Sequence, residues 1–372
     1  MEDISYGTRS VMGKKRIFIK FLIVLLVLVV ICASYVFYFY KSYKREPDET
    51  YLETGITGAY SYFQDDEAIN TQRAYNFLTY NIGFGAYTPE YSFFMDGGKY
   101  SWAFSEEELM ANMCEITDVI NNTGADFVLL QEVDTDGTRT YHINELELLN
   151  QFLKGFYVSN AIEFDSSFIF FPPWQPHGKN QSVLVTYSKG RIASSIRRSL
   201  PISEGFMKVI DYDRCYMVNK IPTANEKNLC IYNVHLSAYT NDEELKRAQI
   251  QKLFDDMAFE YKNGNYVICG GDFNQNLRAI ADDNAPDWAL PFPRDMIPNG
   301  FRLAIDEAKP ENVVHDTTRN ADEPYNPDTT FTVTTDGFIV SDNVNVNFYI
   351  NTDSGYKYSD HDPVFMQVIL KD

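Results

Sequence analysis

The feature that most constrains this chain is the run from Phe21 to Tyr40, which contains no charged residue. A helix of these 20 residues would be about 30 Å long, which matches the thickness of the hydrocarbon core of a bilayer. Apolar residues continue well beyond Ala33 and Ser34, the one small-residue pair that resembles a signal-peptidase site. We therefore predict an uncleaved transmembrane signal anchor over residues 17–40, with a cleaved signal sequence as the alternative.

Positive charge is distributed unevenly around this apolar run. Five Lys or Arg precede it and three follow it, which under the positive-inside rule predicts a cytoplasmic N-terminus. Residues 1–16 would then be a short cytoplasmic tail of a single-pass protein of the cell membrane, and the bulk of the chain would be extracytoplasmic. The basic residues are Arg9, Lys14, Lys15, Arg16, Lys20, Lys41, Lys44 and Arg45.

The rest of the chain has two parts. Residues 41–74 are polar and acidic without a regular apolar pattern, so we interpret them as a juxtamembrane linker. Residues 75–372 contain no repeat and no Gly/Ser/Pro-rich break, and we expect them to form one large domain.

Short apolar runs recur along this domain, and each one ends in polar residues. Their length and their content of Val, Ile, Phe and Tyr are typical of strands. The expected strands cover residues 76–80, 127–130, 183–187, 215–221, 229–234, 266–269, 338–340 and 364–370.

Two helical patterns lie between these runs. Ser105 and Glu108 form a capping box before the first helix. Thr240 and Glu243 are expected to open the second helix, which ends near Gly264. Because strands outnumber helices and often follow one another directly, we predict an α/β fold with mixed or antiparallel sheets covered by helices.

Residues that can bind a metal ion or move a proton lie at the ends of the expected strands. Each of them alone is more often a turn or cap residue, but six such positions in one order are improbable as independent caps. For all of them to meet at one site, the last two strands must run opposite to the first four. The residues are Asn81, Glu132, His235, Asp272 with Asn274, Asp336, and Asp360 with His361.

The segments that contain these residues resemble the endonuclease/exonuclease/phosphatase superfamily, also called the deoxyribonuclease-I-like fold. The resemblance covers residues 75–372, and its most specific parts are GDFN at 271–274 and SDH at 359–361. It implies a four-layered α/β sandwich of two packed mixed sheets covered by helices, here preceded by one transmembrane helix. It also implies one phosphodiesterase or phosphatase site that requires Mg²⁺, with Mn²⁺ as a substitute. The segments are YNIGFG, LLQEVD, NVHLSA, GGDFNQN, TTDGFIV and SDHDPVF.

The same resemblance implies a set of metal ligands. Glu132 is similar to the principal metal-binding carboxylate of the family, with Asn81 beside it and Asp360 as an accessory carboxylate. Carboxylate and amide oxygens are the hard ligands that Mg²⁺ prefers.

The catalytic residues are likewise implied by the resemblance. Asp272 resembles the residue that orients or deprotonates the attacking water, and Asn274 resembles a companion that holds a phosphate oxygen. His361 resembles an imidazole paired with a carboxylate, here Asp336, which fixes the ring's tautomer and raises its basicity. His235 is similar to a second imidazole that hydrogen-bonds the phosphate in the transition state.

The chemistry requires residues of these types. In-line attack on phosphorus needs a positioned water, a base and positive charge near the phosphoryl oxygens. It needs no nucleophilic Ser or Cys, so we expect the cysteines of the domain to pack in its interior. A disulfide between Cys215 and Cys230 is kept as an alternative.

The charge of the chain bears on its substrate. Of the 32 Lys/Arg and 52 Asp/Glu residues, the first 45 positions hold eight and two, so residues 46–372 carry 24 against 50, a net of −26. Binding of long nucleic acid depends on many Lys and Arg, and only Arg191, Arg197 and Arg198 suggest a local basic track. We therefore expect extended nucleic acid to be a poor partner, and phosphate binding to rest on a cation and two imidazoles.

Peripheral segments offer two further clues. Aromatic residues are concentrated at 91–95 and 168–174, where they either pack in the core or form an apolar rim for a lipid. His177, Lys179 and Asn180 lie where members of the family place substrate-contacting loops, so we take them as candidate substrate-binding residues.

Together these observations predict a monomeric, membrane-anchored, Mg²⁺-dependent phosphoric ester hydrolase. Its expected substrate is a phospholipid or sphingolipid head group or a small phosphoester. An extracytoplasmic nuclease is the alternative, and a catalytically silent binding module is a second one.

Overall fold

The computed structural model describes residues 4–59, 68–202, 213–238, 242–278, 286 and 288–371. The chain divides into two units, Met1–Lys44 and Arg45–Asp372. The first unit contains helix α1 (Ile4–Ser42). Its segment Lys14–Ser42 is long and apolar enough to cross a membrane, a property that signal sequences near an N-terminus share.

The second unit is built on two mixed sheets of seven strands each, counted within the described residues. One sheet has the order β1 (Thr50–Tyr51), β7 (Ser194–Ser199), β8 (Cys215–Pro222), β9 (Asn228–His235), β10 (Tyr266–Asp272), β14 (Asp336–Ser341) and β11 (Phe301–Leu303). The other has the order β15 (Val344–Asn351), β16 (Val364–Leu370), β3 (Ala74–Asn81), β4 (Phe127–Gly137), β6 (Asn180–Ser188), β5 (Tyr157–Asp165) and β2 (Thr54–Ile56). Strands β12 (Thr318–Arg319) and β13 (Thr332–Val333) form a separate ribbon.

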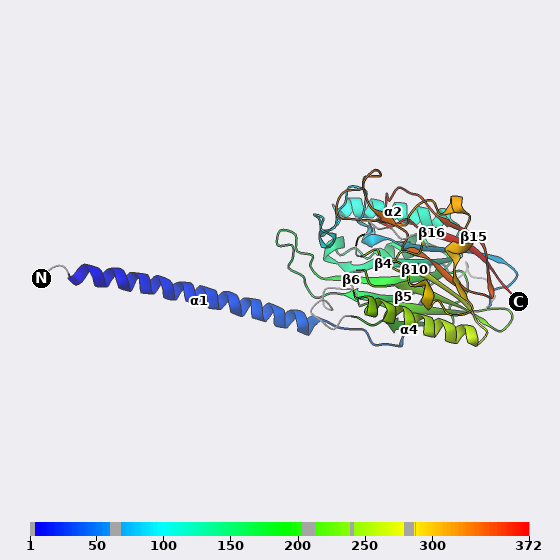
Figure 1. Cartoon of the computed structure of the whole chain (residues 1–372), viewed down its shortest axis with the longest axis horizontal. Helices are drawn as coiled ribbons and strands as arrows, with labels where there is room; N and C mark the ends of the chain where they lie inside the picture. The colour runs from blue at the N-terminus through cyan, green and yellow to red at the C-terminus, as the bar shows by residue number, and fades with distance from the viewer. Residues whose placement is uncertain are drawn as a thin grey trace. The chain divides into compact units, whose positions relative to one another are not determined.

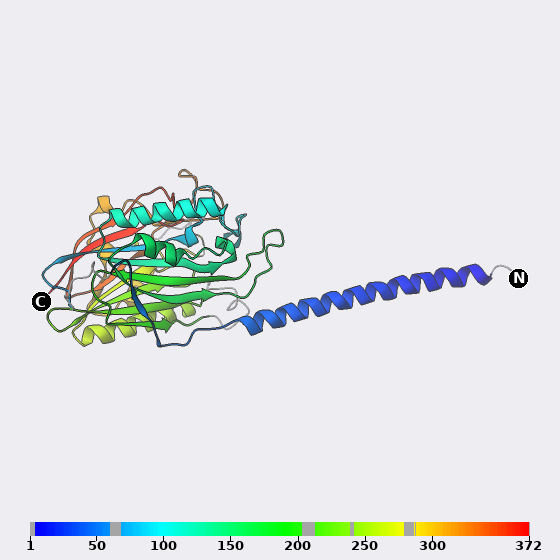
Figure 2. The same ribbon diagram turned by 180° about the vertical axis from the view of Figure 1, so that it is seen from behind.

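Helices cover the outer face of each sheet. Helix α2 (Glu106–Asn122) and helix α3 (Glu145–Phe152) pack on the β3/β4 sheet, and helix α4 (Glu243–Lys262) packs on the β9/β10 sheet. Figures 1 and 2 show α2 and α4 on opposite sides of the paired sheets. This arrangement confirms the predicted four-layered sandwich. The short 3₁₀ helices are η2 (Gly83–Gly85), η3 (Phe94–Asp96), η4 (Thr138–Thr140), η6 (Arg294–Met296), η7 (Ala304–Glu307) and η8 (Pro310–Asn312).

The central strands are buried on both faces, which is why they read as nearly continuous apolar runs. In β3, Phe77 belongs to the core between the sheets, and its ring lies 6.3 Å from that of Phe338 in β14. The next residue, Leu78, belongs to the core beneath α2, together with Met113 and Ile116. Alternate residues of one strand therefore connect the two cores of the domain.

One of the two predicted helix caps is confirmed. The Ser105 hydroxyl accepts the backbone N–H of Glu108 at 3.1 Å, as the capping box predicts. For α4 the cap is instead Asp242, whose carboxylate accepts the N–H of Leu245 at 3.0 Å. Asp242 performs the same role two residues further along the chain than the expected Thr240. Thr240, the expected cap, lies outside the described residues.

The linker assigned to residues 41–74 differs from the structure. From Arg45 onward the chain belongs to the folded unit, where β1 pairs with β7 and β2 pairs with β5 at the edges of the two sheets. These edge strands are held by backbone hydrogen bonds and contribute few apolar side chains, so a hydrophobicity pattern does not reveal them. Residues 60–67 lie outside the described part.

The disulfide alternative is wrong. Cys215 and Cys230 are free. They sit at opposite ends of the β8/β9 pair, where Cys215 lies opposite His235 and Cys230 lies opposite Lys220. Both are buried, as is Cys269, as expected for cysteines with a packing role. Cys114 in α2 is exposed, so for this residue the expectation is wrong.

Strand directions bring the predicted polar residues to one edge of the sandwich. Strands β3 and β4 are parallel to each other, as are β9 and β10, so each pair ends at one edge. Strand β16 is antiparallel to β3, and β14 is antiparallel to β10, so the residues that begin these strands lie at those same edges. The topology that the sequence required is therefore the observed one.

Candidate active site

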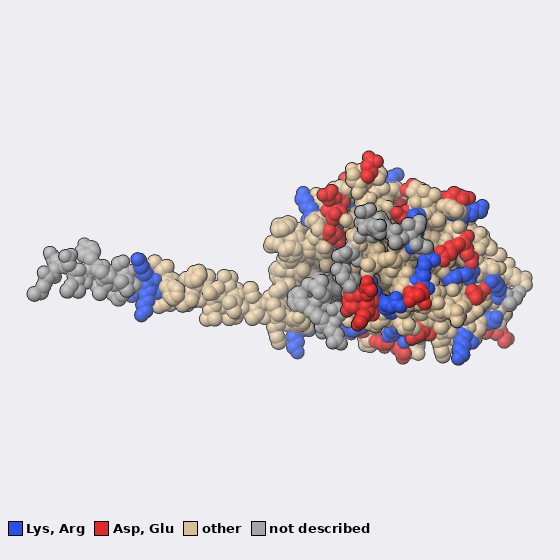
Figure 3. Space-filling view, viewed as in Figure 1, with Lys and Arg blue, Asp and Glu red and all other residues tan. Residues whose placement is uncertain are grey.

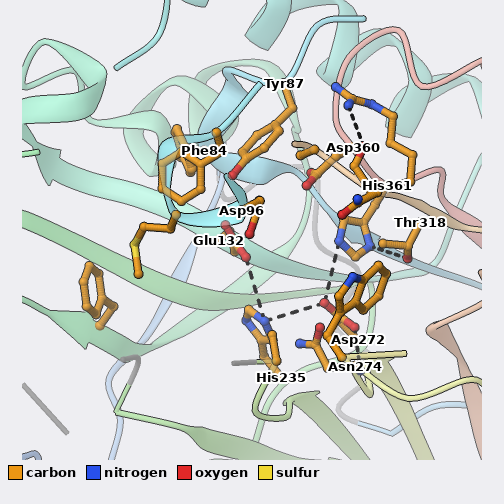
Figure 4. Close-up of a pocket in the computed structure, with 18 of the residues that line it drawn as sticks. Phe84, Tyr87, Asp96, Glu132, His235, Asp272, Asn274, Thr318, Asp360 and His361 are labelled. Carbon is orange, nitrogen blue, oxygen red and sulfur yellow. Dashed lines mark hydrogen bonds and ion pairs between the residues drawn. The ribbon is translucent and has the colours of Figure 1, made fainter. Parts of the chain in front are cut away.

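The polar residues predicted from strand ends converge at this edge (Figure 4). Asp272 at the end of β10 is in register with His235 at the end of parallel β9 and with Asp336 at the start of antiparallel β14. Asn81 and Glu132 come from the other sheet, on β3 and β4. The site is therefore assembled across the two packed sheets.

Asn81 connects the two sheets at the centre of the site. Its Nδ2 lies 3.1 Å from Oδ2 of Asp272 and 3.3 Å from Oε1 of Glu132. Its Oδ1 accepts the backbone N–H of Gly83 at 3.0 Å, which fixes the amide in this orientation. One buried amide thus holds two carboxylates from different sheets in place.

His361 and Asp336 form a buried pair. Nδ1 of His361 lies 2.8 Å from Oδ2 of Asp336, and Thr318 Oγ1 lies 3.0 Å from each of these two atoms. Burial would lower the pKa of His361, but the carboxylates of Asp336 and Asp272 outweigh it and hold the pKa well above its usual value. These carboxylates therefore favour the protonated ring, whose Nε2 lies 3.8 Å from Oδ2 of Asp272.

His235 has a partner that the sequence analysis missed. Its Nδ1 lies 2.7 Å from Oε2 of Glu163 in β5. Burial lowers the pKa of His235 to about 4 and raises the pKa of Glu163 to about 7, so the pair favours its uncharged form. With Nδ1 facing Glu163, the second ring nitrogen points at Asp272 and Glu132, at 3.6 and 3.8 Å. Two facing carboxylates favour a proton on that Nε2.

Glu163 is fully buried within its strand, and Glu is almost never fully buried without a paired group. Its burial therefore indicates that it has a polar partner, here His235. The strand that carries Glu163 has the sequence YVSNAIEFD, and its apolar residues do not form a continuous run. The strand was therefore not predicted, and Glu163 was not singled out.

Asp272 and Asn274 follow one another in a tight turn. The Asn274 N–H donates to Oδ1 of Asp272 at 2.8 Å, and Asn274 adopts a left-handed backbone conformation with φ of 49°. Its Nδ2 donates one hydrogen to the carbonyl of Leu236 at 2.8 Å. The second hydrogen of that amide has no hydrogen-bond partner among the residues that the structure describes, so it can donate to a phosphate oxygen. Strained residues of this kind are concentrated at functional sites.

The oxygen-rich part of the site fits a hard divalent cation. Glu132 sits on a bulge of β4 with φ of 57°, and its side chain lines the pocket together with that of Asp360. Burial raises the pKa of Asp360 to about 6, and the negative charge of Glu132 adds to this. Gly83 leaves the space for Asp360, because a Cβ there would lie 2.9 Å from Oδ1. A bound cation would offset the repulsion between these two carboxylates.

A second group of potential ligands lies nearby, at Asp272, Asp336 and His361, whose ligand atoms are within 4.8 Å of one another. In this group Nδ1 of His361 already bonds to Asp336 at 2.8 Å. We therefore interpret it as a hydrogen-bonded relay. The oxygen donors of Glu132, Asp360 and Asn81 are then the better match for a hard divalent cation.

These side chains open into a pocket of about 300 Å³. Polar side chains, aromatic side chains and three arginines line it. The arginines correct the expectation that phosphate binding would rest on a cation and two imidazoles. The polar side chains include Glu132, His235, Asp272, Asn274, Asp360 and His361; the aromatic side chains are Phe84, Tyr87, Phe93, Phe164 and Trp288; the arginines are Arg139, Arg214 and Arg319.

The three arginines are buried but differ in their surroundings. Arg139 makes two hydrogen bonds to Asp134, at 2.8 and 2.9 Å, and its guanidinium lies 3.7 Å from the centre of the Phe84 ring. Arg319 donates to the carbonyl of Thr88 at 3.0 Å. Arg214 lies beside His235, whose pKa its charge helps to lower. No local motif marks these residues in the sequence, since each reaches the pocket through tertiary packing.

Only one of the candidate substrate-binding residues lies at the pocket. His177 lines it, and burial lowers the pKa of this imidazole to about 3. The Lys179 ammonium instead lies 3.8 Å from Asp165 at the surface. Asn180 is buried, donating to the carbonyl of His177 at 3.0 Å and accepting the N–H of Arg139 at 3.0 Å. Asn180 therefore stabilises the local backbone.

Comparisons with known proteins bear on the family and the fold of the chain. A sequence profile described as the Endonuclease/Exonuclease/phosphatase family matches residues 78–361. No curated protein sequence matches the chain.

Solved structures share the fold at low sequence identity. An endonuclease/exonuclease/phosphatase from Beutenbergia cavernae DSM 12333 has a TM-score of 0.57 and 15% identity, over 81% of this chain and 72% of that one. ANGEL2, a 2′,3′-cyclic phosphatase solved with adenosine-2′,3′-vanadate, has a TM-score of 0.54 and 13% identity, over 81% and 97%. The endonuclease/exonuclease/phosphatase from Bacteroides vulgatus has a TM-score of 0.51 and 16% identity, over 81% and 100%.

Proposed function

The chain belongs to the endonuclease/exonuclease/phosphatase family, and on this basis we propose that it is a membrane-anchored, Mg²⁺-dependent hydrolase of small or lipid-borne phosphoesters. The observation that carries the proposal is the convergence of Asp272 with two buried imidazole–carboxylate pairs on one pocket. A structural role alone would not require two such pairs to face the same carboxylate.

In the proposed reaction, Asp272 orients the attacking water. Its Oδ2 lies within 3.1–3.8 Å of Asn81 Nδ2, His235 Nε2 and His361 Nε2, and these donors fix the orientation of the side chain. A carboxylate fixed in this way can accept a proton from water as the oxygen–phosphorus bond forms. The N–H groups of the two imidazoles then face the phosphoryl oxygens as negative charge accumulates on them.

Glu132, Asp360 and Asn81 would hold the magnesium ion. The ion would supply positive charge to the phosphoryl oxygens and the leaving group, and Mn²⁺ would fit the same oxygen donors. Asn81 would bind the ion through its Oδ1, the atom that in this structure accepts the backbone N–H of Gly83.

The pocket favours a compact phosphoester. A volume of about 300 Å³ is at the lower end of small-molecule sites. The aromatic side chains that line the pocket suit the apolar part of a substrate, and the arginines suit its anionic phosphate. A phospholipid or sphingolipid head group, or a small soluble phosphoester, meets these requirements.

Nuclease activity on long duplexes is the weaker alternative. Arg197 is buried and lies 3.5 Å from Asp213, and Arg198 pairs with Asp256 at 2.9 Å. On the face seen in Figure 3, the described basic and acidic side chains are interspersed and form no continuous basic track. A catalytically silent binding module is also less favoured, because all of the predicted motif residues are present and lie together.

We further propose that α1 anchors the protein with its N-terminus in the cytoplasm and the domain outside, as a monomer. The uneven flanking charges of α1 support this orientation. Protease added to intact cells should release the domain, and complete protection would contradict the orientation.

The function is tested by assaying the full-length protein in detergent with Mg²⁺ and with EDTA. The substrates are a chromogenic phosphodiester, sphingomyelin, inositol phosphates and plasmid DNA. Metal-dependent turnover of the small or lipid substrates is expected. Efficient plasmid nicking without turnover of the others would support the nuclease alternative.

A further inference from the structure

An apolar hairpin extends from the pocket side of the domain between β5 and β6, over residues 166–179 (the aromatic hairpin). Ile169 and Gly178 pair across its base, with backbone hydrogen bonds of 2.9 and 3.0 Å. In Figure 1 the hairpin projects as a green loop beyond the strands that it connects. Gly178 is required at the base, because its φ is +76° and a Cβ would lie 2.3 Å from Thr138.

Three large apolar side chains are exposed on this hairpin within five positions. Phe170, Phe171 and Trp174 are 59%, 60% and 75% exposed. Other large apolar side chains exposed on the described part of the domain are separated from one another along the chain, for example Phe152, Phe259 and Phe348. Isolated exposed residues are normal, but a contiguous apolar group indicates an interaction surface.

The hairpin also lacks the acidity of the rest of the domain. Residues 166–179 contain no Asp or Glu and one Lys, in a domain with 50 acidic residues. A tip of Trp and Phe without negative charge is suited to contact a lipid interface, where aromatic rings insert at the level of the head groups. Acidic side chains there would be repelled by anionic lipids and would lose hydration.

The hairpin is fixed in place and connected to the pocket. Trp102 Nε1 donates to the carbonyl of Pro176 at 2.7 Å, which ties the returning arm of the hairpin to the domain. The Phe94 ring lies 6.0 Å from Phe171 and 5.2 Å from His177, and His177 lines the pocket. Because the hairpin is already ordered, docking it on a surface would cost little conformational entropy.

The N-terminal helix indicates that the surface which the aromatic hairpin contacts is a lipid bilayer. The candidate span ends at Ser42, and Arg45 is already fixed by its hydrogen bond to the carbonyl of Leu200 at 2.7 Å. Two residues of about 3.5 Å each therefore separate the end of the anchor from the folded domain. In the anchored protein a bilayer surface is always within reach of the domain.

We propose that the aromatic hairpin is a second membrane contact, which inserts Phe170, Phe171 and Trp174 into the head-group region and places the pocket beside it. This inference rests on the proposed membrane anchoring and deepens the proposed function, because it makes lipid-borne phosphoesters the preferred substrate class.

The test uses full-length protein reconstituted into vesicles of phosphatidylcholine that contain brominated acyl chains, which quench nearby tryptophan. The Trp174→Phe variant isolates the emission of Trp174 by difference. We expect this emission to be quenched several-fold relative to unbrominated vesicles, and the double variant Phe170→Ser/Phe171→Ser to lose the quenching. Phe259→Ser removes an equally exposed ring from α4 and should leave the quenching unchanged.

The outcomes separate the inference from the proposed function. No quenching of Trp174 in the wild-type protein would overturn the inference, as would a dimer in detergent that dissociates in the double variant, which would assign the hairpin to a second copy. Quenching does not depend on catalysis, so quenching without any phosphoester hydrolysis would reject the proposed function alone. In an active protein, the double variant should lose hydrolysis of vesicle-borne substrate several-fold and retain hydrolysis of a soluble phosphodiester.

Discussion

Glu163 contacts both His235 and the backbone of Glu132. Its Oε2 lies 2.7 Å from Nδ1 of His235, and its Oε1 accepts the N–H of Glu132 at 2.8 Å. One buried carboxylate thus orients an imidazole from one sheet and a proposed metal ligand from the other. The left-handed backbone at Glu132 is held in part by this contact.

Replacing Glu163 should therefore impair catalysis without removing any group that touches the substrate. In Glu163→Ala, the His235 ring and the Glu132 N–H lose their partner, and we expect kcat to fall by about 10–100-fold. The unsatisfied buried groups should also destabilise the fold by about 1–3 kcal/mol. Steady-state kinetics and thermal unfolding of the purified protein check both effects.

Glu163→Gln is the matched control. Its amide oxygen can still accept from Glu132, and its amide N–H can still face Nδ1 of His235. We expect it to retain more activity than the alanine variant. Equal loss in both variants would mean that the negative charge, and not the orientation of His235, is what Glu163 supplies.

Mg²⁺ should stabilise the folded protein through Glu132. A ligand that binds only the native state adds about 2.7 kcal/mol at 100 times its Kd, which appears as a rise in the unfolding temperature. Glu132→Gln should lose most of this rise, because one of the proposed carboxylate ligands is removed. Asp136→Asn, an exposed carboxylate on the same strand, should keep the full rise. A wild-type protein whose unfolding temperature does not respond to Mg²⁺ or Mn²⁺ would argue against the metal site.

Lys246 should make stability depend on pH. Burial lowers the pKa of this ammonium to about 8, and the charge of Arg214 contributes. Between pH 8 and the ordinary value of 10.5, the unfolded chain holds a proton that the native chain has released, so native stability rises with pH in this window. Below pH 8 Lys246 is protonated in the native state, and its buried charge lowers the free energy of unfolding.

The Lys246→Met variant isolates this effect. The stability difference between wild type and variant should move in favour of the wild type as pH rises from 8 to 10.5, by on the order of 1–3 kcal/mol. Chemical unfolding at several pH values measures it. Lys262→Met changes an exposed position on the same helix and should show no comparable trend, and a flat difference for Lys246→Met would contradict the buried-charge account.

Much of the fold was predictable because its central strands are buried on both faces. Runs such as residues 229–234 and 266–269 need no tertiary information to be recognised as strands, and they became β9 and β10. The edge strands β1 and β2 were not predictable in this way. They depend on pairing with distant strands, at Arg197 and Val158 for example.

The residues of the candidate site also fall into a group that could be predicted from the sequence and a group that could not. Residues at strand ends, such as Asp272 and His235, could be placed together by strand direction alone. Glu163, Thr318 and Arg214 could not, because each reaches the site from a segment whose sequence carries no motif. His177 and Lys179 are two positions apart, yet one lines the pocket and the other is at the surface, because the left-handed backbone of Gly178 between them interrupts the alternation of an extended strand.

The central claim is that Asp272 and its imidazole partners hydrolyse a phosphoester. The most direct measurement is turnover of a chromogenic phosphodiester by full-length wild type, Asp272→Asn and His361→Ala, with Mg²⁺ and with folding checked by circular dichroism. We predict metal-dependent turnover by the wild type and a loss of at least about 100-fold in each folded variant. Retention of more than a few per cent of wild-type activity by either folded variant would contradict the account.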